Sequence, residues 1–183
     1  GSALPLEENI ANTKKVVAAA HACGVSVEGE IGVIGQAVDG PEGLKTDAVG
    51  LADPDHCEQF VKETGVDCFA AALGNAHGLY TREPKLRFDL LREIKKRTDI
   101  PLVLHGGTGI PEDDIRKAIT MGVSKINFST VMRKGCIETL TETLNSNPGE
   151  LDLMKLLTPA KLKMVEIAKH HILMCMSDGK AWK

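Results

Sequence analysis

Residues 101–109 read PLVLHGGTG, and residues 70–78 read AAALGNAHG. In both segments an apolar run of strand length ends on a histidine and a glycine, a pattern typical of strands buried in a parallel sheet. We therefore expect His77 and His105 to emerge at the carboxyl ends of neighbouring strands. Parallel α/β folds carry their chemistry at that edge of the sheet.

Size and composition predict a globular protein, or a piece of one, with a single core. The 183 residues are 43% hydrophobic and 26% charged, which excludes a disordered chain. The formal net charge is −3 and the aromatic content is 3%. A nucleic-acid-binding surface needs a basic face and aromatic stacking platforms, so the composition argues against one.

The apolar runs and the cysteines predict the compartment of the protein and the redox state of its thiols. No apolar run approaches the length of a membrane helix, and the opening GSALP does not resemble a secretion leader. The five cysteines are an odd number without zinc-finger spacing. We expect reduced thiols and a cytoplasmic protein with no membrane or nucleic-acid partner.

Four αβ units follow one another along the chain, each with a helical stretch, a glycine or turn, an apolar run and a glycine-rich exit. This alternation predicts an α/β fold with a parallel sheet, either doubly wound or closed as a barrel. The glycines do not form the G-x-G-x-x-G of a dinucleotide-binding fold, which favours the barrel. The predicted helices cover 6–22, 54–64, 86–98, 111–121 and 131–145, with a longer helical tail over 151–175 broken near Pro159.

The chain opens with a turn and a helix and offers four strands, whereas a (β/α)₈ barrel has eight. An isolated half-barrel would leave long exposed sheet edges. We therefore expect the N-terminal strands to be missing from this chain or supplied by another one. Residues 1–183 are predicted to form one domain, with 151–183 as a C-terminal helical tail.

The two strand-end histidines are candidate zinc ligands. Adjacent parallel strands lie roughly 5 Å apart, so both imidazoles are within reach of one ion. A single histidine is more often a structural or surface residue, but two at equivalent strand ends, each followed by glycine, favour a metal. A catalytic zinc has three protein ligands. Glu30, at the end of an earlier strand, is the candidate third ligand or an alternative metal position.

Glycine-rich exits also suit an anion, because backbone N–H groups can converge on a phosphate near a helix N-terminus. The segment 106–109 precedes such a helix, and 127–130, reading NFST, offers amide and hydroxyl donors at the next one. Tight turns and an ordinary N-cap would explain both segments equally well. Arg82 and Lys85 are candidates for additional positive charge.

These motifs together resemble the class II, zinc-dependent ketose-bisphosphate aldolases that act on fructose or tagatose bisphosphate. Residues 1–9, GSALPLEEN, look like the family's G-S-H-x-P-x-x-E-N, and residues 27–32, VEGEIG, look like V-E-x-E-x-G. Residues 74–78, 102–109 and 125–130 look like G-x-x-H-G, L-V-L-H-G-G-[ST]-G and K-[IV]-N-x-x-T. Five motifs in the same order make the resemblance specific.

The resemblance implies that this chain is the C-terminal portion of a (β/α)₈ TIM barrel, with strands 5 to 8 and their helices. It implies that His77 and His105 bind zinc, and that a monovalent cation is a second candidate cofactor. The implied reaction cleaves a ketose 1,6-bisphosphate to dihydroxyacetone phosphate and glyceraldehyde 3-phosphate, in a homodimer or homotetramer. The implied substrate-binding residues are Gly78, Gly106, Gly107, Thr108, Asn127, Ser129 and Thr130.

The chain also departs from the family pattern. The family's third zinc histidine and its catalytic aspartate are expected upstream of Gly1. Ala3 stands where the family has histidine, Val38 where a loop glutamate is common, and Val131 where an acidic residue follows the last motif. These departures keep two alternatives open: a metal-dependent sugar-phosphate isomerase or epimerase, and a catalytically silent aldolase-like subunit.

Overall fold

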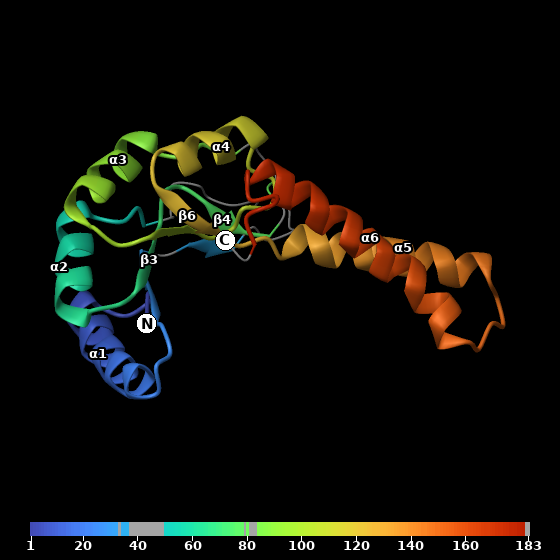
Figure 1. Cartoon of the computed structure of the whole chain (residues 1–183), viewed down its shortest axis with the longest axis horizontal. Helices are drawn as coiled ribbons and strands as arrows, with labels where there is room; N and C mark the ends of the chain where they lie inside the picture. Colours follow the sequence, from blue (N-terminus) through green and yellow to red (C-terminus); the bar gives the residue numbers. More distant parts are fainter. Residues whose placement is uncertain (33, 37–49, 79, 81–83, 182–183) are drawn as a thin grey trace. The chain divides into compact units, whose positions relative to one another are not determined.

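A four-stranded parallel sheet forms the centre of residues 1–127, as a computed structural model of the chain shows (Figure 1). The structure describes residues 1–32, 34–36, 50–78, 80 and 84–181. The strands pair in the order β1-β3-β5-β6. They are β1 (Glu28–Ile31), β3 (Cys68–Ala71), β5 (Leu102–Leu104) and β6 (Val123–Ile126). The parallel α/β class predicted from the alternating pattern is therefore confirmed.

Four helices alternate with these strands and lie along one face of the sheet (Figure 1). All four lie within two residues of the predicted bounds. Gly65 adopts a left-handed φ of 68° directly after the second helix, a position that favours glycine. The helices are α1 (Leu6–Ala22), α2 (Pro54–Thr64), α3 (Phe88–Arg97) and α4 (Glu112–Thr120).

Side-chain alternation divides the sheet into an apolar face and a polar face. In β1, Gly29 and Ile31 are buried while Glu28 and Glu30 are half-buried. A Cβ at Gly29 would lie 2.5 Å from the ring of Phe60 in α2, so the helix packs directly on the strand backbone. The core under the helices includes the fully buried side chains Phe60, Phe69, Leu91, Ile94, Leu104 and Ile115.

An irregularity in β6 decides what the polar face contains. Leu102 pairs with Val123, but Val103 pairs with Lys125, so one residue of β6 is skipped. A bulge of this kind turns the following side chains to the other face of the sheet. Val123 is consequently buried with the apolar side chains, whereas Lys125 lies on the polar face.

The sheet is curved, as a contact between its two edge strands indicates. Lys125 Nζ on β6 lies 2.8 Å from Glu28 Oε2 on β1, although two strands separate them. In a flat sheet three steps of about 4.8 Å would place the edge backbones about 14 Å apart, and side chains that stand roughly perpendicular to the sheet would not meet across that distance. The polar face is therefore concave, which is compatible with part of a barrel.

A second, two-stranded parallel sheet was not expected from the sequence. It pairs β2 (Gly35–Gln36) with β4 (Ala76–His77). The residues are too few to give a periodic signal, so pattern analysis had no means of detecting the pair. The consequence is that His77 belongs to β4 and not to the strand that precedes it in the first sheet.

Residues 128–183 form the second compact unit, which is a helical hairpin. It contains α5 (Thr130–Ser146) and α6 (Leu153–Met174). Gly135 of α5 allows close packing, because a Cβ there would meet the Ile167 side chain of α6. The predicted break near Pro159 is wrong, since α6 continues through that residue. One lost N–H bond does not end a helix that packing supports on both sides.

Among the described residues, no helix is long and apolar enough to cross a membrane.

Candidate functional site

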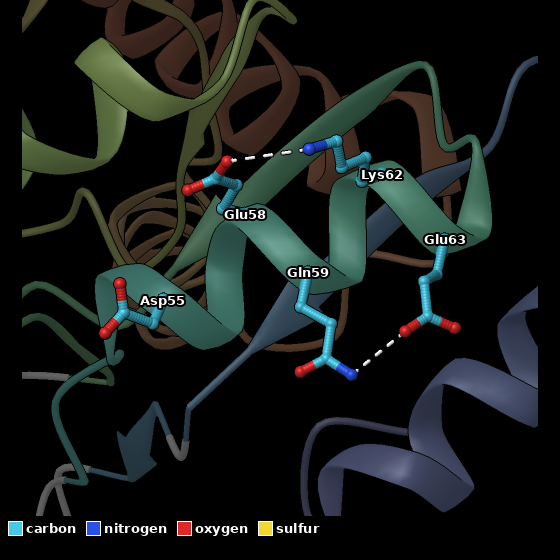
Figure 2. Close-up of a pocket in the computed structure, with 5 residues that line it drawn as sticks. All are labelled: Asp55, Glu58, Gln59, Lys62 and Glu63. Carbon is cyan, nitrogen blue, oxygen red and sulfur yellow. Dashed lines mark hydrogen bonds and ion pairs between the residues drawn. The ribbon is translucent and has the colours of Figure 1, made fainter.

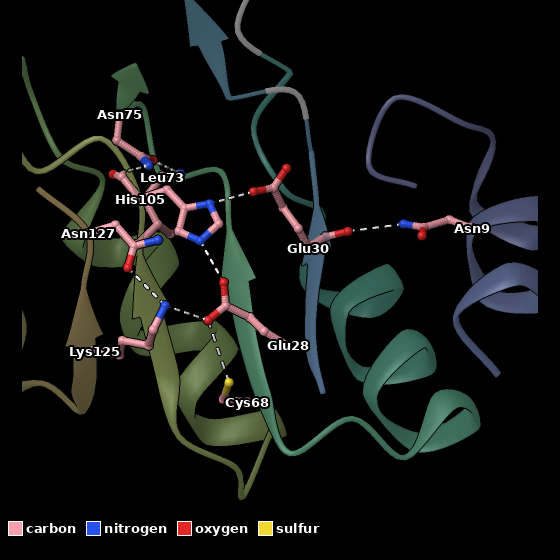
Figure 3. A network of polar contacts seen from close by, with 9 residues as sticks. All are labelled: Asn9, Glu28, Glu30, Cys68, Leu73, Asn75, His105, Lys125 and Asn127. Atoms are coloured by element: carbon pink, nitrogen blue, oxygen red, sulfur yellow. Dashed lines mark hydrogen bonds and ion pairs between the residues drawn. The ribbon is translucent and has the colours of Figure 1, made fainter. Parts of the chain in front are cut away.

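The imidazole of His105 lies between the carboxylates of Glu28 and Glu30, which both belong to β1 (Figure 3). His105 directly follows β5, and its side chain is only 13% exposed. Its Nε2 is 2.7 Å from Glu28 Oε1, and its Nδ1 is 2.6 Å from Glu30 Oε2. The hydrogen bond to Glu30, supported by the one to Glu28, raises the pKa of His105, although burial acts against this.

The two glutamates share a face because they are two residues apart on a strand. Burial acts to raise both of their pKa values. At Glu28 the hydrogen bonds from Lys125 and His105 outweigh burial, so the pKa is lowered. At Glu30 the bonds from His105 and Ser2 and the nearby charge of His77 have the same result. Both carboxylates are therefore held in their charged form.

His77 approaches this group from β4, which belongs to the second, two-stranded sheet. Its ring centroid lies 5.9 Å from that of His105, so the structure brings the two predicted imidazoles together. Glu30 contacts Nδ1 of His105 and lies near enough to His77 to respond to its charge. Two imidazole nitrogens and a carboxylate oxygen are suitable donors for zinc. Among the described residues, however, no three His, Cys, Asp or Glu side chains already converge on one metal position.

Lys125 and Asn127 extend the group along β6 (Figure 3). Lys125 Nζ lies 2.8 Å from both Glu28 Oε2 and Asn127 Oδ1. An ammonium group only donates hydrogen bonds, so it is the carbonyl oxygen of Asn127 that faces Lys125. The backbone of Asn127 is also fixed, since its N–H donates to Leu104 and its C=O accepts from Gly107.

Polar contacts hold the loops that follow β3 and β5. Asn75 is fully buried; its Nδ2 donates to the carbonyl of His105 at 2.8 Å. The Tyr80 hydroxyl accepts from the Ala76 N–H at 2.7 Å and donates to the carbonyl of Gly106 at 3.1 Å. Gly106 has a φ of 63°, and a Cβ there would collide with the Ala76 carbonyl. These contacts fix the backbone before His77 and after His105.

The candidate phosphate residues lie in both units. Gly78, Gly106, Gly107 and Thr108 belong to the first unit, where the Gly107 N–H donates to the Asn127 carbonyl and Thr108 is buried. Ser129 and Thr130 belong to the second unit, where Ser129 precedes α5 and Thr130 begins it. Two predicted positions, Val38 and Arg82, lie outside the described residues.

Three residues of this group were not identified from the sequence as functional. Glu28 was part of a family motif, and its alternation with Glu30 on a strand was the signal that could have singled it out. Lys125 also began a family motif, but the bulge in β6 breaks the simple alternation that would place it on the polar face. Asn75 gave no signal, because only the fold brings its amide to the loop that carries His105.

A separate concave patch lies on the surface of α2 (Figure 2). Gln59 bonds to Glu63 at 2.9 Å, and Lys62 pairs with Glu58 at 3.8 Å. The lining side chains are half-buried or exposed, and some also pair with the neighbouring helices, Glu63 with Lys14 of α1 and Glu58 with Arg97 of α3. Such pairs are typical of a solvated surface. The patch therefore does not compete with the His105 group as a candidate site.

Comparisons with known proteins agree on one family. The family model described as "Fructose-bisphosphate aldolase class-II" matches residues 1–180. A probable fructose-bisphosphate aldolase of Bacillus subtilis is 48% identical over 157 residues, covering 86% of this chain and 54% of its own. The fructose-bisphosphate aldolase of Staphylococcus aureus is 45% identical over 168 residues, covering 92% and 58%. The chain thus spans about half the length of these relatives.

Two solved structures are similar to the chain over nearly all of its length. The YdjI aldolase from Escherichia coli K12 has a TM-score of 0.82 and 32% identity, with 99% of this chain and 60% of that one covered. A putative fructose-1,6-biphosphate aldolase from Coccidioides immitis has a TM-score of 0.81 and 29% identity, with 98% and 62% covered.

Proposed function

The chain belongs to the class-II fructose-bisphosphate aldolase family, and from that premise we propose that it carries half of the active site of a zinc-dependent aldolase. The reaction is the reversible cleavage of a ketose 1,6-bisphosphate, fructose or tagatose, to dihydroxyacetone phosphate and glyceraldehyde 3-phosphate. The observation that supports the proposal is the pairing of His77, in β4, with His105, directly after β5: their ring centroids lie 5.9 Å apart.

His77 and His105 would hold the zinc ion, with Glu30 as a further ligand or an alternative partner. When bound, zinc supplies a Lewis acid that polarises the ketose carbonyl. The Glu30 carboxylate lies at hydrogen-bond distance from His105, so a rotation of its side chain would be enough for it to leave His105 and bind zinc. A complete site needs at least one ligand more, together with an acid-base group. We expect both from the half of the relatives' length that this chain does not span.

The backbone turn after β5 would hold the phosphate of the dihydroxyacetone phosphate portion. Gly78, Gly106 and Gly107 leave room for close approach of a ligand to the main chain, and Thr108 adds a hydroxyl. Asn127, fixed through Lys125, offers an amide donor from the neighbouring strand. Ser129 and Thr130, at the N-terminus of α5 in the second unit, remain substrate-binding residues in this proposal.

The whole enzyme would be a (β/α)₈ barrel in the cytoplasm, with this chain providing strands 5 to 8. The concave polar face of the sheet supports that architecture, since a barrel carries its chemistry at the carboxyl ends of such strands. The domain prediction, with residues 1–183 in one partial barrel and 151–183 as its tail, remains part of this proposal. So do the homodimeric or homotetrameric assembly and the monovalent cation.

The test is product analysis on the protein expressed at its full natural length and loaded with zinc. Fructose and tagatose 1,6-bisphosphate are supplied separately, and dihydroxyacetone phosphate is measured by reduction with NADH and glycerol 3-phosphate dehydrogenase. We expect its formation from at least one of the two sugars. A product of unchanged mass would instead identify an isomerase or epimerase, and zinc binding without any turnover would identify a silent subunit.

A further inference from the structure

Two charged residues without an assigned role connect His105, the proposed zinc ligand, with Asn127, the proposed substrate-binding residue. Glu28 on β1 uses one carboxylate oxygen for His105 and the other for Lys125. Lys125 on β6 contacts both Glu28 and Asn127. The result is a continuous series of contacts, from His105 through Glu28 and Lys125 to Asn127, with distances of 2.7 to 2.8 Å.

We propose that Glu28 and Lys125 are positioning residues of this site: Glu28 fixes the ring of His105, and Lys125 fixes both Glu28 and the amide of Asn127. The inference rests on the proposed function, in which His105 binds zinc and Asn127 contacts the substrate. Neither Glu28 nor Lys125 needs to touch zinc or substrate itself.

The geometry at His105 gives Glu28 its role. A metal-binding histidine uses one ring nitrogen for the metal and donates its other N–H to a carboxylate or carbonyl, which fixes the ring orientation. Glu28 contacts Nε2, while Nδ1 faces Glu30, the other candidate ligand. Glu28 therefore holds the hydrogen on Nε2 and leaves Nδ1 as the ligand atom.

The geometry at Asn127 gives Lys125 its role. The ammonium group binds the carbonyl oxygen of the amide, so the Nδ2 donors of Asn127 point elsewhere. An amide that is fixed in this way can present only its NH₂ group to a ligand oxygen. Without Lys125 the amide would be able to rotate and present either end.

The contacts are more than an ordinary surface ion pair. Exposed pairs contribute little because solvent screens them and the side chains move freely. Lys125 is 51% exposed, but the Glu28 side chain is only 26% exposed and is also held by His105 and by Cys68, whose Sγ lies 3.6 Å from its Oε2. Glu28 and Lys125 are 97 residues apart and come from opposite edges of the sheet, so their contact depends on the curvature of the whole sheet.

The experiment compares Glu28→Gln and Lys125→Met with wild type, using the full chain. Long-range ¹H–¹⁵N spectra report which ring nitrogen of His105 carries hydrogen, and amide spectra report the Asn127 side chain. Zinc affinity is measured by competition with a chromophoric chelator. We expect Glu28→Gln to change the His105 ring signals and to weaken zinc binding by about 10- to 100-fold, the usual effect of removing such a partner. Lys125→Met should shift the Asn127 amide signal, and Lys125→Arg should restore it in part.

Matched controls are Glu63→Gln and Lys14→Met, which remove the charges of an ion pair between α2 and α1 at 2.9 Å. They should leave the His105 signals and the zinc affinity unchanged. The proposal is overturned if Glu28→Gln folds and keeps the wild-type His105 spectrum. Should Glu28→Gln fail to fold, unchanged His105 and Asn127 signals in Lys125→Met overturn it. If the wild-type protein binds no zinc, the proposed function fails, while the spectra still test the positioning roles.

Discussion

At the residue scale, His105 combines two properties that rarely occur together by chance. Its ring is largely buried, and both of its nitrogens face carboxylates. Ionised carboxylates only accept hydrogen bonds, so the two contacts satisfy the ring completely when both of its nitrogens carry hydrogen. Binding of zinc at Nδ1 would then release the hydrogen from that nitrogen, replace the Glu30 contact and retain the Glu28 contact.

The first prediction concerns the two histidines. His77→Ala and His105→Ala should each reduce zinc bound to the full-length protein to background, because each removes one of the few nitrogen donors at the site. Elemental analysis after dialysis against buffer with trace zinc measures this. The control is His170→Ala, in α6 of the second unit. A zinc content that stays at the wild-type level in either variant would refute the ligand assignment.

The second prediction concerns Gly106. Gly106→Ala should destabilise the fold by about 2 kcal/mol or more, because it adds a collision with the Ala76 carbonyl to the cost of a left-handed φ. Gly24→Ala is the matched control: its φ of 68° is nearly the same, but nothing lies within 4 Å of its added Cβ. That variant should lose only about 1 kcal/mol. Urea unfolding of both variants compares them, and equal losses would contradict the close approach.

At the scale of elements, the second unit depends on a helix that contains a proline. Pro159 lies inside α6, which is 22 residues long. An interior proline costs about 3 kcal/mol relative to alanine, because it lacks the N–H donor and crowds the carbonyl four residues before it. The helix nevertheless continues, since Leu156 and Ala160 on either side are buried.

The third prediction follows from this element. Pro159→Ala should stabilise α6 by about 1 to 2 kcal/mol, since the gain in helix propensity exceeds the added freedom of the unfolded chain. Thermal unfolding followed by circular dichroism at 222 nm measures the change. Lys161→Ala, at a neighbouring exposed position, should change stability by less than about 0.5 kcal/mol. A lower melting temperature for Pro159→Ala would show that the proline contributes a needed bend.

At the scale of the whole molecule, stability is coupled to pH through a buried thiol. Cys57 of α2 is fully buried, and burial raises the pKa of its thiol from 9.0 to about 12. Between these two values the unfolded chain releases the proton and the folded chain retains it. The unfolded state then binds fewer protons, so the free energy of unfolding falls as the pH rises, by at most about 1.4 kcal/mol per pH unit.

The fourth prediction tests this coupling. The stability advantage of wild type over Cys57→Ala should be constant below pH 8 and should narrow as the pH rises above 9. Urea unfolding at several pH values under reducing conditions measures both proteins. Cys23→Ala is the control, because Cys23 is exposed. If the stability advantage of wild type over Cys57→Ala stays constant up to pH 10.5, the buried thiol of Cys57 does not couple stability to pH.

The sequence by itself determined the alternation of strands and helices and the place of His105 at the end of β5, whereas His77 lies in β4 and not at the end of the strand predicted before it. These features are local: apolar periodicity and the glycines that end helices are readable within a dozen residues. That is why the bounds of the helices were predicted within two residues, while the short pair β2 and β4 was not detected.

Only the tertiary structure decided which side chains meet. Glu28 and His105 are 77 residues apart, and Lys125 reaches Glu28 because a bulge in β6 turns it to the concave face. Register, bulges and sheet curvature arise from packing between elements, and no local pattern encodes them. The chemistry was therefore visible in residue types, but its arrangement was fixed by contacts between strands that are distant in the sequence.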